Sequence, residues 1–118
     1  MSFIPRSLLA VAAACAISLT FSSSALAATV DADAAKDLAQ DNDCFKCHSI
    51  DKPKKGPSYK KIAAKYKGKE AEGEKDIIKQ ITTGPKVKLD DGTEKEHKII
   101  DTKDQAQIMN LVHWILSQ

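Results

Sequence analysis

Two cysteines and a histidine stand together in the string Cys44-Phe45-Lys46-Cys47-His48. Two thiols at this spacing can add across the two vinyl groups of a haem, and the adjacent histidine then lies close enough to reach the iron. A C-x-x-C-H string is therefore typical of covalent haem attachment, and a proximal histidine commonly holds haem iron. The sequence predicts one covalently bound haem, with Cys44 and Cys47 as attachment points and His48 as an iron ligand.

Other uses of this cysteine pair agree less well with the rest of the chain. A single C-x-x-C pair in an exported protein can form a small disulfide or serve as a thioredoxin-like redox pair. A thioredoxin-like domain needs alternating strands and helices, however, and the sequence shows little strand signal. A zinc site usually takes four ligands, often from a second cysteine or histidine pair, and no second pair is present. We therefore favour haem, then disulfide chemistry, then zinc.

Residues 1–27 have the pattern of a secretory signal peptide. Arg6 supplies positive charge, residues 8–19 are apolar, and residues 25–27 read Ala-Leu-Ala, as at a cleavage site. The apolar run is too short for a convincing transmembrane helix. We expect residues 28–118 to form a single exported domain in the periplasm, without a membrane span. Cys15 lies within this apolar run. We expect it to be removed with the signal peptide. The alternatives are that Cys15 carries a lipid or that the signal stays uncleaved as a membrane anchor.

The apolar residues of the exported domain recur with the spacing of helices. Four helices are expected, at residues 32–43, 58–66, 71–81 and 102–118. Acidic residues at the start of the first helix suit the helix dipole, and the string from Thr102 to Gln105 fits a capping box for the last. The expected buried face of the last helix consists of Ile108, Leu111, Val112 and Ile115, with Trp114 beside it.

The segment between the last two helices has a different pattern. Within residues 84–101, Val87 and Leu89 alternate with lysines, and Asp91-Gly92 is a turn typical of hairpins. The fold class that follows is all-α, with four to five short helices around one haem and a small hairpin as the candidate for β-structure.

Three segments follow one another in an order found in a known family. They are the cysteine string, Gly56-Pro57 with the helix that runs to Tyr66, and residues 111–118. In these segments the chain resembles the small bacterial class I c-type cytochromes. The resemblance implies a fold in which the first and last helices cross and pack. It also implies that the backbone carbonyl of Pro57 accepts a hydrogen bond from His48 Nδ1, which would orient the imidazole.

The second iron ligand departs from the family pattern. Class I cytochromes usually place an axial methionine in the loop before the final helix, and here that loop contains no methionine. Met109 lies instead within the expected final helix, away from its buried face. His97 lies in the loop, near the position that the methionine normally occupies. We therefore expect His48 and His97 to bind the iron, with Met109, Lys98 and a solvated His113 as alternatives. Two imidazoles predict a lower reduction potential than a histidine–methionine pair.

Charge is balanced overall but unevenly distributed. The whole chain has a formal net charge of +2, yet eight lysines and no acidic residue occur from Lys52 to Lys69. This run is either a solvated surface or a docking patch for an acidic redox partner. Nucleic acid is excluded as a partner class, because the near-neutral balance and the lack of interleaved aromatic residues do not fit a nucleic-acid surface. We expect a monomer.

Two functions are compatible with these features. The first is a periplasmic one-electron carrier, which is not an enzyme and in which protein ligands fill both axial positions of the iron. The second is a ligand-binding or sensory haem protein, or a small peroxidase-like enzyme, with an open or displaceable distal site. Iron binding by His97 separates the two, and we favour the carrier.

Overall fold

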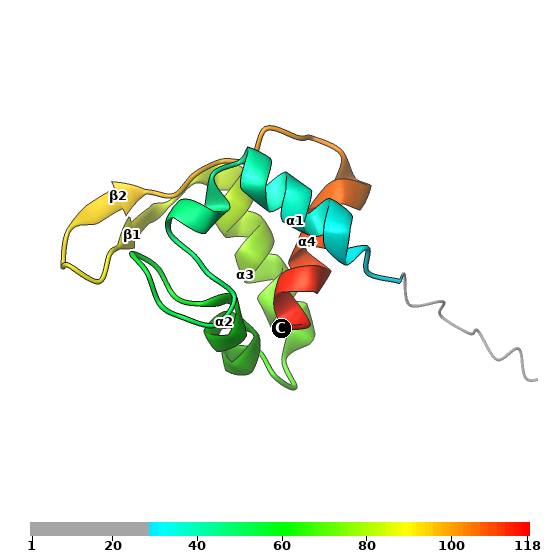
Figure 1. Cartoon of the computed structure of the whole chain (residues 1–118), viewed down its shortest axis with the longest axis horizontal. Helices are drawn as coiled ribbons and strands as arrows, with labels where there is room; N and C mark the ends of the chain where they lie inside the picture. The colour runs from blue at the N-terminus through cyan, green and yellow to red at the C-terminus, as the bar shows by residue number, and fades with distance from the viewer. Residues whose placement is uncertain (1–28) are drawn as a thin grey trace, which may run out of the picture.

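The structure is a computed structural model that describes residues 29–118. Within this part of the chain it contains four α-helices, one short 3₁₀ helix and one two-stranded antiparallel hairpin (Figure 1). The elements are α1 (Ala32–Asp41), η1 (Cys44–Lys46), α2 (Tyr59–Lys65), α3 (Glu70–Thr83), β1 (Lys86–Lys88), β2 (Glu94–Glu96) and α4 (Gln105–Leu116). The predicted helical class and its small hairpin are confirmed. The predicted signal peptide, residues 1–27, lies outside the described residues.

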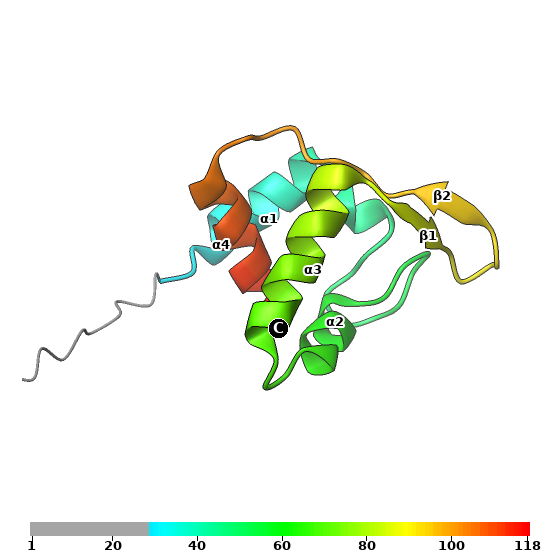
Figure 2. The same ribbon diagram turned by 180° about the vertical axis from the view of Figure 1, so that it is seen from behind.

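The last helix, α4, is the element against which the other helices pack. It contacts α1, α2 and α3, and the two opposite views show α1 lying across it (Figures 1 and 2). The buried residues of α4 are Ile108, Leu111, Val112, Trp114 and Ile115, as expected. The helix α1 meets this face with Ala35 and Ala39, which are fully buried. Because the distance between packed helices depends on the side chains at the contact, these alanines let α1 and α4 approach closely.

Asparagine side chains tie both ends of α1 to distant parts of the chain. At the C-terminal end, Asn42 donates to the Leu38 carbonyl at 3.0 Å and accepts from the Asp101 backbone nitrogen at 2.9 Å. At the N-terminal end, Asn110 of α4 accepts from the Asp31 nitrogen and donates to the Asp31 carbonyl, both at 2.8 Å. These bonds fix α1 against α4 and against the segment that follows the hairpin.

The start of α4 differs from the expected capping box. The N-cap is Asp104, whose carboxylate accepts from the backbone nitrogens of Ala106 and Gln107. Thr102 instead accepts a hydrogen bond from the Asp104 nitrogen. An aspartate at the N-cap satisfies free amides of the first turn and places negative charge at the positive end of the helix. The predicted helix start at residue 102 was therefore too early.

Two helices end at residues with a left-handed backbone, and both turns lead toward the predicted site. The helix α1 ends at Asp41, and Asp43, at φ 58°, turns the chain into η1. The helix α3 continues to Thr83, beyond its predicted end, and Gly84, at φ 60°, stops it before β1. Among the described residues, no helix is both long and apolar enough to cross a membrane.

Candidate haem site

The predicted attachment string consists of η1 and the two residues that follow it, Cys47 and His48. The backbone nitrogens of Cys47 and His48 both donate to the Cys44 carbonyl, at 3.2 and 2.9 Å. This tight turn folds the backbone of Cys47 and His48 back against that of Cys44. Both cysteines are free thiols, as thioether formation requires, and both are half-buried. Burial raises the pKa of the Cys44 thiol above its ordinary value.

The side chain of His48 is held in one tautomer. Its Nδ1 lies 2.7 Å from the Pro57 carbonyl oxygen. Because a carbonyl can only accept, Nδ1 carries the proton and Nε2 keeps its lone pair. Burial also lowers the pKa of His48, which favours the neutral imidazole that a metal needs. The structure thus brings together His48 and Pro57, the pair that the family resemblance implied.

Residues 56–59 surround the His48 ring. A Cβ atom built on Gly56 would lie 2.9 Å from His48 Cε1, so glycine is the residue that leaves room for the ring here. Two residues after Pro57, the ring of Tyr59 stacks on the imidazole, with centres 5.4 Å apart and planes 23° apart. Sequence reasoning assigned no role to Tyr59. The signal available was an aromatic residue close behind Gly56-Pro57.

The hairpin brings His97 to the same region. Directly after β2, the His97 backbone nitrogen donates to the Pro85 carbonyl at 3.0 Å, which extends the pairing of the two strands. Gly84 allows this approach, because a Cβ atom there would lie 2.7 Å from the His97 carbonyl oxygen. The His97 Nδ1 donates to the Lys98 carbonyl at 2.9 Å, so in the neutral imidazole the lone pair is on Nε2.

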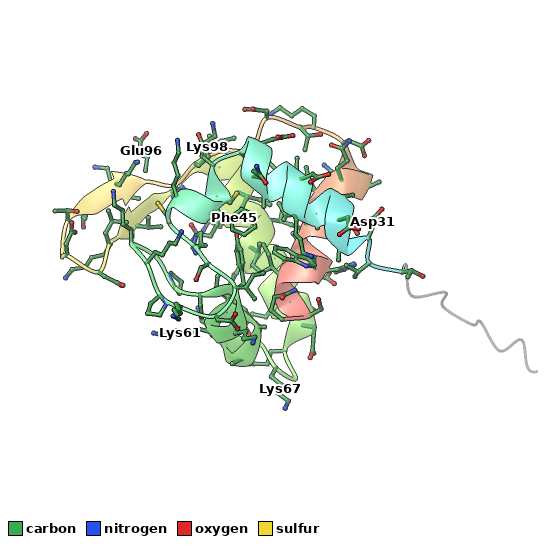
Figure 3. All side chains as sticks on the ribbon, in the orientation of Figure 1. Asp31, Phe45, Lys61, Lys67, Glu96 and Lys98 are labelled. Atoms are coloured by element: carbon green, nitrogen blue, oxygen red, sulfur yellow. The ribbon has the colours of Figure 1, made fainter. Side chains whose placement is uncertain are left out.

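The two imidazoles have the separation expected of ligands to one metal. Their ring centres are 6.1 Å apart, with planes 43° apart. Imidazole nitrogen lies about 2.0–2.1 Å from a bound metal and about 1 Å from its own ring centre, so two opposed ligands have centres about 6 Å apart. In the view of Figure 3, Phe45 of the attachment string and Lys98, the neighbour of His97, both lie between the hairpin and α1. The two thiols and the two imidazoles fit a covalently attached haem.

The alternative ligands have other surroundings. His113 was expected to be solvated, but its Nε2 lies 2.9 Å from a Glu74 carboxylate oxygen and its side chain is only 34% exposed. The sequence offered no signal for this pair, because the residues belong to α4 and α3. Met109 is half-buried on α4 and does not belong to the buried core, and Lys98 is exposed.

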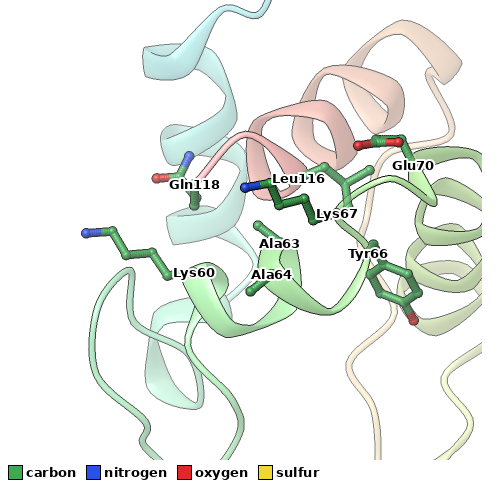
Figure 4. Close-up of a pocket in the computed structure, with 8 residues that line it drawn as sticks. All are labelled: Lys60, Ala63, Ala64, Tyr66, Lys67, Glu70, Leu116 and Gln118. Carbon is green, nitrogen blue, oxygen red and sulfur yellow. The ribbon is translucent and has the colours of Figure 1, made fainter.

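A surface hollow of about 360 Å³ lies elsewhere on the molecule, between α2 and the end of α4 (Figure 4). Its lining mixes lysine side chains with Ala63, Tyr66 and Leu116. It contains none of the predicted haem-site residues, and we assign it no role.

Comparison with known proteins identifies the family. Residues 32–118 match the Cytochrome c family. Cytochrome c-552 of Nitrosomonas europaea is 36% identical over 86 residues, covering 64% of this chain and 84% of that protein. Cytochrome c-551 of Pseudomonas aeruginosa is 33% identical over 81 residues, covering 69% of this chain and 73% of that protein.

Solved structures of cytochromes share the fold. The class 1 cytochrome MtoD from Sideroxydans lithotrophicus ES-1 is 57% identical, with a TM-score of 0.71, covering 75% of this chain and 97% of that one. Wild-type Nitrosomonas europaea cytochrome c552 is 28% identical, with a TM-score of 0.53, covering 70% and 96%. The chain therefore belongs to the cytochrome c family: it is a class I c-type cytochrome, a haem-based electron carrier whose cofactor is covalently bound haem c.

Proposed function

We propose that this cytochrome carries single electrons between redox proteins of the periplasm, with haem attached through Cys44 and Cys47 and its iron bound by His48 and His97. The observation that carries the proposal is the pair of imidazoles, 6.1 Å apart between ring centres. Each ring binds a backbone carbonyl through Nδ1, at 2.7 Å for His48 and 2.9 Å for His97. Both Nε2 atoms are therefore left for a metal.

The neighbours of these ligands define how the chain would use the haem. The bound haem supplies an iron that accepts and releases one electron. A carbonyl that accepts from Nδ1 fixes the ring and raises the basicity of the ligating nitrogen, and Pro57 and Lys98 supply these carbonyls. Since imidazole is a stronger donor than a thioether, the His48 and His97 pair stabilises the ferric form. The expected potential is lower than that of histidine–methionine relatives.

The periplasmic location is supported by the sequence pattern of residues 1–27, in which a charged start, an apolar run and Ala25-Leu26-Ala27 follow one another. The partner proposed is an acidic redox protein that meets the lysines from Lys52 to Lys69. All eight of these lysines are exposed in the structure. Their positive charge would act mainly on the rate of encounter.

A haem protein that binds an external ligand is the second candidate, and one observation favours it. His97 follows a hairpin whose strands have three residues each, and an isolated two-stranded hairpin is only marginally stable. Displacement of His97 with this hairpin would open one side of the iron to a small ligand such as carbon monoxide.

Absorption and electron-paramagnetic resonance spectra of the purified protein test the proposal. We expect low-spin ferric iron without the far-red band of iron–methionine bonding, and no rapid carbon monoxide binding after reduction. The variant His97→Ala should become high-spin and bind carbon monoxide. As controls, Met109→Leu and His113→Ala should keep the wild-type spectrum.

Two outcomes would contradict the assignment. Rapid carbon monoxide binding by the wild-type protein would favour the second candidate. An unchanged spectrum in His97→Ala, together with a changed one in Met109→Leu, would transfer the ligand role to Met109.

A further inference from the structure

One lysine from outside the haem-attachment string binds directly to its backbone. Lys54 Nζ donates to the Phe45 carbonyl oxygen at 2.7 Å, and Phe45 lies between the two attachment cysteines. A short helix leaves its last carbonyls without partners inside the helix, and a lysine side chain can supply the missing donor. Lys54 does this for η1, so its positive charge is held against the attachment string.

The backbone around Lys54 is joined to the same string. The Gly56 nitrogen donates to the Cys47 carbonyl at 2.8 Å, and the Lys54 nitrogen donates to the Gly56 carbonyl at 3.0 Å. His48 and Pro53 also form an isolated antiparallel bridge. These backbone contacts fix the point from which the exposed Lys54 side chain extends. The position of its ammonium group is therefore set by the fold of this loop.

No carboxylate in the described part of the chain pairs with Lys54. The lysines that form ion pairs there are Lys36, Lys46 and Lys60. Lys46 also belongs to the attachment string, but an Asp43 carboxylate oxygen lies 3.0 Å from its ammonium nitrogen and offsets its charge. Lys54 therefore contributes an uncompensated positive charge at the string.

We propose that the charge of Lys54 raises the reduction potential of the haem. Ferric haem carries one more positive charge than ferrous haem, so a fixed cation beside it destabilises the ferric form. Because each thioether joins a haem vinyl carbon to a cysteine sulfur, a haem attached to this string lies beside the Lys54 charge. The effect opposes in part the lowering expected from two imidazole ligands. The inference rests on the proposed attachment through Cys44 and Cys47, and it does not depend on the second iron ligand.

Substitutions that change the charge at position 54 in steps test the inference. Lys54→Met removes one positive charge and keeps a similar side-chain length. We expect the equilibrium constant for reduction, measured in 0.01 M salt against a reference couple, to fall about twofold, as for one exposed charge interaction. Twofold corresponds to about 18 mV, since tenfold is 59 mV for one electron. Lys54→Glu should give a fall of about fourfold, and Lys54→Arg should match the wild type.

The same series separates charge from a structural role. Loss of the hydrogen bond to Phe45 alone would shift the potential equally in Lys54→Met and Lys54→Glu. An effect of charge is twice as large, in millivolts, in the glutamate variant. It also shrinks in 1 M salt, where charges act over only about 3 Å.

Lys61→Met is the matched control. Lys61 is an exposed lysine of α2 in the same lysine-rich segment, so the variant makes the same change of net charge away from the attachment string. It should shift the potential less than Lys54→Met does. An unchanged potential in Lys54→Met, equal shifts in Lys54→Met and Lys54→Glu, or an equal shift in Lys61→Met would overturn the inference. Absence of low-spin haem from the wild-type protein would instead contradict the proposed function.

Discussion

At the scale of single residues, Gly56 controls how closely the backbone approaches His48. A Cβ atom there would lie 2.9 Å from His48 Cε1 and 3.3 Å from the Cys47 carbonyl oxygen. The Pro57 carbonyl holds the imidazole on Nδ1, so the ring cannot turn away without losing a hydrogen bond. Gly56 therefore belongs to the candidate haem site although it carries no side chain.

The variant Gly56→Ala should disturb the iron ligand. We expect part of the ferric protein to become high-spin, and the free energy of unfolding in urea to fall by about 1–3 kcal/mol, as for overpacked interiors. Gly68→Ala is a suitable control, because a Cβ atom there meets nothing within 4 Å although φ is 77°. That variant should lose about 1–2 kcal/mol through backbone strain alone and keep the wild-type spectrum. Equal spectral changes in both variants would argue against a specific contact with His48.

At the scale of elements, Asn42 links α1 to the segment between the hairpin and α4. It is 2% exposed, accepts from the Asp101 nitrogen and donates to the Leu38 carbonyl. The segment that contains His97 is anchored by this bond at its far end and by the hairpin at its near end. A buried asparagine outside the haem site therefore helps to position the proposed second ligand.

Loss of this side chain should be costly. Asn42→Ala leaves the Asp101 nitrogen without its partner, and each buried unsatisfied group costs about 1–3 kcal/mol. We expect a lower urea midpoint, and loss of His97 ligation before global unfolding, followed by absorption. Asn110→Ala is the control: its two bonds to Asp31 are exposed, so its cost should stay near 1 kcal/mol. A larger cost in Asn110→Ala than in Asn42→Ala would disprove the proposed difference.

The sequence predicted the elements where local signals act alone. The apolar spacing of α4 identified its five buried residues, and Asp91-Gly92 identified the hairpin turn. Errors arose where two local signals compete. Thr102 and Asp104 can both cap a helix, and Asp104 does so because its carboxylate reaches two amides of the first turn.

Long-range contacts could not be predicted from the sequence. The bond of Asn42 to Asp101 and that of His113 to Glu74 join residues 59 and 39 positions apart, so neither follows from spacing. The candidate site shows the same division. The string from Cys44 to His48 is a local motif, whereas the separation of His48 and His97 depends on how the hairpin lies against the turn at η1.

At the scale of the whole molecule, the lysines from Lys52 to Lys69 form a strongly positive region. Figure 3 shows Lys61 and Lys67 extending from the surface. Lys54 donates to the Phe45 carbonyl at 2.7 Å, which places part of this region beside the haem-attachment string. Lys60 pairs with Asp51 in an exposed ion pair, and exposed pairs add little stability. This exposed positive charge is the feature on which the proposed recognition of an acidic partner depends.

Charge reversal tests this role. On gold coated with a carboxylate-terminated monolayer, Lys61→Glu should reduce the amount of electroactive protein severalfold at 0.01 M salt, where charges act over about 30 Å. The difference should vanish near 1 M salt. Lys79→Glu makes the same change of net charge on the exposed side of α3 and should have a smaller effect. Equal losses in the two variants would mean that net charge, rather than the lysine region, governs adsorption.

The two hydrogen bonds between Asp31 and Asn110 have a practical consequence for attaching this protein to a surface or to another protein. They fix the beginning of the folded domain at the α1 end, and the hairpin that leads to His97 projects from the opposite end (Figures 1 and 2). A tag, fusion partner or lipid tether joined ahead of Asp31 would therefore hold the domain at the end opposite the hairpin. The end that bears the proposed iron ligand would point outward, toward whatever exchanges electrons with it.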